Sequence, residues 1–60
     1  MTYLQDLETN LKALPKAEIK DAMLYYEQYF YEGHLSDGQA VAEFGTPKNL
    51  ARRLVADYYM

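Results

Sequence analysis

The 60-residue sequence contains no cysteine and no tryptophan, and it has only one histidine and one serine. Without cysteine the chain can form neither a disulfide framework nor a cysteine zinc site, so packing alone must hold the fold together. A single histidine excludes a two-histidine metal site within one chain. The absence of cysteine also fits a reducing compartment, and we expect a cytoplasmic location.

Groups that could perform catalysis are equally scarce. Ser36 is better explained as a helix cap than as a nucleophile. His34 lies near Glu32 and Asp37, and we interpret it as an exposed side chain at a helix C-terminus, where positive charge is favoured. The glycines stand singly, so the sequence has no phosphate-binding loop. We therefore predict no catalytic residues, no metal and no cofactor.

The sequence also lacks a long hydrophobic run. Its most apolar run, residues 22–26, is far shorter than the roughly 20 residues that span a bilayer. No basic region followed by an apolar core opens the chain, so we predict no signal peptide. If the natural chain continues past residue 60, these residues could be the cytoplasmic head of a membrane protein.

A capping signal and a leucine stripe predict the first helix. Thr2 followed by Gln5 fits a capping box, in which each residue satisfies a backbone N–H of the other. We predict a helix over residues 3–13. Four leucines recur on one face of it, at intervals of three and four residues: Leu4, Leu7, Leu11 and Leu14.

Proline and glycine bound the second helix. Pro15 suits the first position of a helix, because its missing N–H would be unpaired there in any case. Gly33 or His34 suits the end of the same helix. We predict a helix over residues 15–33. Its core face carries Ile19, Met23, Tyr26 and Phe30.

Similar signals bound two further helices. Ser36 with Gln39 repeats the capping-box spacing, and Gly45 suits a helix end. Thr46 and Pro47 then follow as a cap and a first-position proline. The predicted helices span residues 37–44 and 47–59. The last of them carries Leu50, Ala51, Leu54 and Tyr58 on one face.

No segment shows the sustained alternation of apolar and polar residues that a strand requires. The connections between the four predicted helices are only a few residues long, as a compact bundle requires. We therefore predict a single all-α domain over residues 1–60, folded as a compact bundle of four short helices.

Seven of the nine aromatic residues are tyrosine, and several lie off the core face of the second helix. We expect the rings of Tyr25 and Tyr29 to cover the small core while their hydroxyls stay in water. Leu24 and Tyr31 point further away from the core face of this helix. They either cover the core or form a surface for a partner or a second copy. All four are our candidate protein-interaction residues.

The other tyrosines receive different assignments. Tyr26 and Tyr58 fall on the apolar faces of their helices, so we expect both in the core. Tyr3 and Tyr59 remain without an assigned role.

The last two helices have the spacing of a helix-turn-helix motif that reads DNA. In that case Lys48, Arg52 and Arg53 would contact phosphates or base edges. The net charge of −3 argues against this interpretation, because DNA-binding domains usually carry a clear basic excess. We keep DNA binding as an alternative and do not expect a nucleic acid partner.

Four segments in order resemble the HAAS domain, the helix-turn-helix-associated α-helical signalling domain. They are LPKAE at residues 14–18, YYEQYF at 25–30, SDGQ at 36–39 and AEFGTPKNLA at 42–51. The resemblance covers nearly the whole chain, and the Gly-x-Pro-Lys-x-x-Ala stretch is its most specific part. Residues often acidic in the family differ here: Ala17, Lys20, Gln28, Gly38 and Gln39.

The resemblance implies a cytoplasmic α-helical module that acts through protein contacts. In the family this module commonly precedes membrane-spanning segments and is encoded beside PadR-like transcription regulators. We predict a non-catalytic signalling or protein-interaction module that regulates, or senses for, a PadR-like regulator. The alternatives are DNA binding through residues 37–44 and 47–59, and a structural domain that associates with itself into a homo-oligomer.

Overall fold

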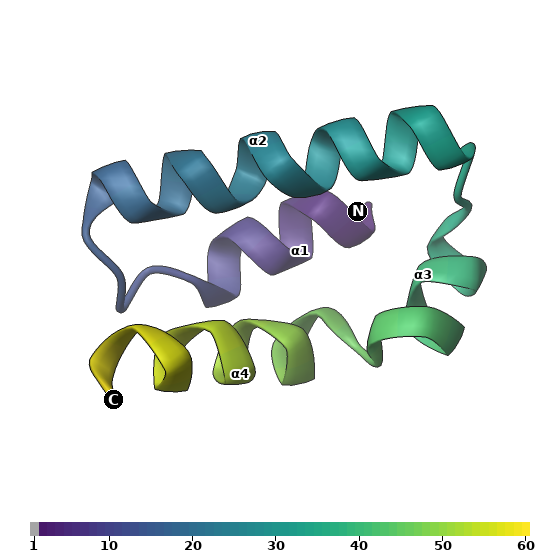
Figure 1. Cartoon of the computed structure of the whole chain (residues 1–60). Helices are drawn as coiled ribbons and strands as arrows, with labels where there is room; N and C mark the ends of the chain where they lie inside the picture. The colour runs from purple at the N-terminus through teal and green to yellow at the C-terminus, as the bar shows by residue number, and fades with distance from the viewer. Residues whose placement is uncertain (1) are drawn as a thin grey trace.

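A computed structural model describes residues 2–60, which form four α-helices and no strand. The helices are α1 (Tyr3–Asn10), α2 (Lys16–Gly33), α3 (Asp37–Phe44) and α4 (Pro47–Tyr59). α1 packs against both α2 and α4 and lies between them in Figure 1, while α3 connects the far end of α2 to the start of α4. The prediction of an all-α bundle is confirmed.

The predicted capping signals are confirmed at three helix starts. Thr2 with Gln5 and Ser36 with Gln39 form the two capping boxes. At α4, the Asn49 N–H donates to Thr46 Oγ1 at 3.2 Å, and Pro47 is the first helical residue. Each cap satisfies a backbone N–H that would otherwise lack a partner in the first turn, so the boundaries follow from local chemistry.

The prediction for the end of α1 is wrong, because the helix stops at Asn10 and not at residue 13. The Leu11 N–H bonds to the Glu8 carbonyl at 3.1 Å, and the Leu14 N–H bonds to the Leu11 carbonyl at 2.9 Å. These tight turns lead the chain toward α2 while both leucines stay buried. Burial of two leucines therefore decides where the helix ends.

α2 begins one residue later than predicted, and a left-handed residue closes it. Pro15 is the extended N-cap, and its carbonyl accepts the Ile19 N–H at 3.0 Å. At the other end His34 adopts φ 52° and ψ 39°, and its N–H reaches back to the Phe30 carbonyl. Helices often end on such a residue, and glycine usually fills the position.

The core draws on all four helices and includes one residue without an assigned role. Its buried members are Tyr3, Leu7, Leu11, Leu14, Met23, Phe30, Ala40, Leu50 and Ala51. Tyr3 is only 3% exposed, and its hydroxyl donates to the Gly45 carbonyl at 2.7 Å. The buried stripe of α1 therefore starts at Tyr3, and Leu4 is only partly buried. Tyr26, predicted in the core, is partly buried against it.

The prediction that Tyr58 lies in the core is wrong, because its side chain is 46% exposed. α1 ends at Asn10, so the last turn of α4 lies beside the connection between α1 and α2 and not beside a helix. There the Tyr59 hydroxyl donates to the Ala13 carbonyl at 2.7 Å. The contact at this end of α4 is thus made by the neighbouring tyrosine.

Candidate interaction surfaces

The four candidate contact residues divide between two surfaces of α2. Leu24 and Tyr31 are seven residues apart, so they lie nearly in line along the helix. They are 55% and 83% exposed. Tyr25 is 61% exposed, and it lies about 100° around the helix from Leu24. Tyr29 is exposed on the same side as Tyr25. The structure thus separates the two pairs.

Tyr25 and Tyr29 form a surface that we call the aromatic patch. The Tyr29 ring centroid lies 5.4 Å from that of Phe44 in α3, and the Tyr25 centroid lies 5.0 Å from that of Tyr26. Both pairs meet edge to face, which is a favoured geometry for aromatic rings. The patch is therefore held by rings beneath it while much of its area remains exposed.

The Tyr29 hydroxyl donates a hydrogen bond to Glu43 Oε1 at 2.6 Å, which ties the aromatic patch to α3. This hydrogen bond to the Glu43 carboxylate raises the pKa of Tyr29 above its usual value of 10.0. Burial raises the pKa values of Tyr3 and Tyr26 in the same direction. In all three cases the folded protein holds the hydroxyl proton more tightly than the unfolded chain does.

Alkaline pH is therefore expected to destabilise the fold. Above about pH 10 tyrosines of the unfolded chain lose protons that the folded chain retains, so the free energy of unfolding falls as pH rises. Tyr29→Phe removes one of these contributions to stability, so its destabilising effect at pH 8 should shrink as the pH rises above the usual tyrosine pKa. Urea denaturation at pH 8, 10 and 11 measures both trends. A Tyr29→Phe difference that stays constant across this range would contradict the assignment to the Glu43 hydrogen bond.

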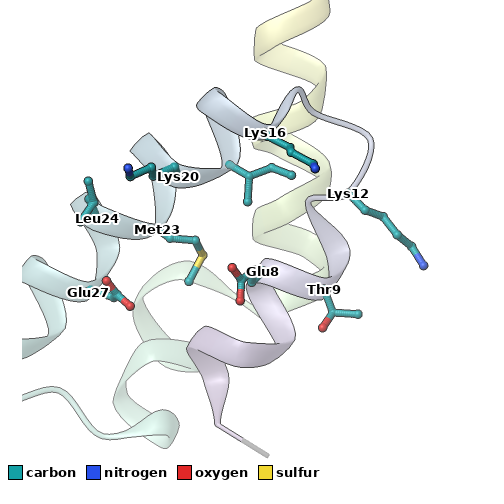
Figure 2. A pocket seen from close by; sticks show the side chains of 9 residues that line it. Glu8, Thr9, Lys12, Lys16, Lys20, Met23, Leu24 and Glu27 are labelled. Atoms are coloured by element: carbon teal, nitrogen blue, oxygen red, sulfur yellow. The ribbon is translucent and has the colours of Figure 1, made fainter.

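A groove of ≈ 500 Å³ runs between α1 and α2, and we call it the charged groove (Figure 2). Its apolar residues are Ile19, Met23 and Leu24, all from α2. Its polar and charged residues are Glu8, Thr9, Lys12, Lys16, Lys20 and Glu27. Leu24 is the only candidate contact residue that lines it. The groove could not be predicted from the sequence, because no local signal shows that α1 and α2 lie side by side.

The three candidate DNA-contact residues differ in how available their side chains are for binding a phosphate. The guanidinium of Arg53 donates from Nη2 to the Phe44 carbonyl at 2.7 Å, so it closes the C-terminal end of α3. Arg52 lines a shallow hollow together with Glu43, whose carboxylate would repel a phosphate. Lys48 is exposed in the first turn of α4. Contact with DNA stays a prediction that the geometry does not favour.

Residues 2–60 contain neither a metal-binding cluster of side chains nor a helix that could span a membrane. In this part of the chain no three His, Cys, Asp or Glu side chains are grouped so that they could hold a metal ion. Within the same residues, no helix combines the length and the apolar character needed to cross a membrane.

Comparison with known families supplies the remaining observation. A model of the HAAS family matches residues 2–53, from the cap of α1 to the middle of α4. The chain belongs to the HAAS family. The match to this HAAS domain includes all of α2 and α3, and therefore both the aromatic patch and the charged groove. No curated protein and no solved structure matches the chain.

Proposed function

We propose that this HAAS domain is a non-catalytic, cytoplasmic signalling module that binds a PadR-like transcription regulator through the aromatic patch. The observation that carries the proposal is the exposed Tyr25 ring, held against Tyr26 and Tyr29 at centroid distances of 5.0 and 6.4 Å. The family's association with PadR-like regulators supports the choice of partner.

Both tyrosines of the aromatic patch are already restricted, which lowers the entropic cost of binding a partner. A side chain that must be ordered on binding loses rotamer freedom, and this opposes association by about 0.5–1.5 kcal/mol. Neighbouring rings already restrict Tyr25, and the Glu43 hydrogen bond restricts Tyr29. Ordered, exposed tyrosines are typical of residues that dominate binding energy at protein interfaces. The aromatic patch therefore fits a protein partner better than it fits a small ligand.

The proposal predicts that Tyr25→Ala weakens binding to the regulator by about 10-fold or more, a typical loss for an aromatic anchor. Isothermal titration calorimetry of the domain against the PadR-like regulator encoded beside it measures this effect. Tyr31→Ala is the matched control, since it removes an equally large ring that lies off the patch, and it should change the affinity by less than about 3-fold.

Circular dichroism should show unchanged helix content for both variants, because neither ring is buried. Absence of binding by the wild-type domain at about 100 μM would remove this regulator as the partner. Equal losses for the two variants would remove the aromatic patch as its binding surface.

A further inference from the structure

A second exposed stripe runs along α2, and its residues are three and four positions apart. It consists of Ala17, Lys20, Leu24, Glu27 and Tyr31, and we call it the α2 seam. All five side chains are exposed, so none of them is covered by another helix within residues 2–60. Alternating spacings of three and four are the pattern with which one helix packs along another.

Charge is distributed along this side of the molecule with a clear polarity. Lys20 lies four residues before Leu24, and Glu27 lies three residues after it. Both residues also line the charged groove, so both lie on the side of the seam that borders the groove, which we call its flank (Figure 2). Lys16 lines the groove nearer the start of α2. The flank therefore changes from basic to acidic across the exposed apolar side chain of Leu24.

Such a surface is complementary to itself when turned end for end. We propose that a second copy of this chain docks on the α2 seam, with the two α2 helices antiparallel and a twofold axis near Leu24. A twofold interface joins the same patch of both copies, so each contact occurs twice. Lys20 of one copy then faces Glu27 of the other, since their heights along the helix differ by one residue, about 1.5 Å.

The orientation follows from the same charges. In a parallel arrangement in register, Lys20 would meet Lys20 and Glu27 would meet Glu27, and like charges at close range are destabilising. The antiparallel arrangement replaces both repulsions by attractions and keeps Leu24 against Leu24 at the centre. The aromatic patch lies around the helix from the seam, so this inference goes beyond the proposed function and does not depend on it.

The available surface is sufficient for such a dimer. An interface of ordinary size buries about 800 Å² per partner, which is less than a fifth of the 4378 Å² surface of the chain. The seam covers fifteen residues of helix, which rise about 21 Å from first to last. The partly exposed Ile19 lines the groove beside it.

Charge reversal tests the pairing directly. Lys20→Glu and Glu27→Lys should each weaken self-association by about 10-fold or more, because each variant alone places like charges opposite each other twice. An equimolar mixture of the two variants should associate within about 3-fold of the wild type, since the mixed dimer restores opposite charges at both contacts. Sedimentation equilibrium up to about 1 mM measures these constants.

The mixture also controls for folding. If each variant self-associates weakly but the two associate with each other, both variants must be folded. Asp57→Lys controls for net charge, since it makes the same change as Glu27→Lys on an exposed part of α4 and should leave the dimer unaffected. A wild-type chain that stays monomeric up to about 1 mM overturns the proposal. A mixture that associates no better than its components overturns it as well.

Discussion

Leu7→Ala is expected to lower the free energy of unfolding by about 2–5 kcal/mol, the range for truncating a buried leucine. Leu7 lies at the middle of α1 with no exposed surface, and α1 is the helix that contacts both α2 and α4. A 60-residue domain has a total stability of about 3–9 kcal/mol, so this single change removes much of it. A cavity in the core would weaken both contacts of α1.

Thermal denaturation followed by circular dichroism measures this effect. A loss of 2 kcal/mol alone corresponds to about 8–16 °C in the melting temperature of a domain of this size. Met60→Ala is the control: it truncates a large apolar side chain that is 99% exposed and lies on neither proposed surface, and it should change stability by less than about 0.5 kcal/mol. Similar losses for the two variants would contradict the assignment of Leu7 to the centre of the core.

Gly45→Ala is expected to destabilise the domain by about 1–3 kcal/mol through backbone strain. Gly45 has φ 86° and ψ −171°, a conformation that is essentially restricted to glycine. The added Cβ would lie 3.8 Å from the Asn49 Cβ, which is ordinary contact, so steric overlap is not the cause. Relief of the strain would move the Gly45 carbonyl, which accepts the hydrogen bond from the buried Tyr3.

Gly38→Ala provides the opposite control for the same chemical change. Gly38 is helical, and an added Cβ would meet no atom within 4 Å. Alanine restricts the unfolded chain more than glycine does, so this variant should stabilise the domain by about 0.4–1 kcal/mol. Urea denaturation of both variants measures the two signs. A neutral or stabilising Gly45→Ala would show that the turn between α3 and α4 can adopt another conformation.

Most helix boundaries could be predicted from the sequence because the signals that set them are local. The caps at Thr2, Ser36 and Thr46 each bond to a residue three positions later, so a short stretch of sequence is enough to identify them. The end of α1 could not be predicted in this way. It depends on Leu11 and Leu14 turning into a core that exists only after α2 and α4 have packed.

The buried stripe of α1 begins at Tyr3, one residue before the start that the leucine spacing predicts. Tyr3 and Leu7 are four residues apart, and Leu11 follows at the same interval. A stripe starting at Leu4 has almost the same spacing, and spacing alone does not choose between them. The choice depends on the partner of the Tyr3 hydroxyl, the Gly45 carbonyl, which lies 42 residues along the chain.

The candidate surfaces could be predicted only as single residues. Sequence spacing separated Leu24 and Tyr31 from Tyr25 and Tyr29, because helical geometry is regular. It could not show that Glu43 of α3 binds the Tyr29 hydroxyl. The charged groove needs side chains from two helices, so it exists only when α1 lies beside α2.

The placement of α1 between α2 and α4 also has a consequence for biosynthesis. α4 is the last of the four helices to leave the ribosome, yet α1 makes its most extensive contacts with it. Contacts between distant segments form only after the intervening chain has been closed into a loop, which opposes early folding. The leucines of α1 can pack against α2 as soon as that helix is made, but we expect their core to be completed only when α4 has emerged.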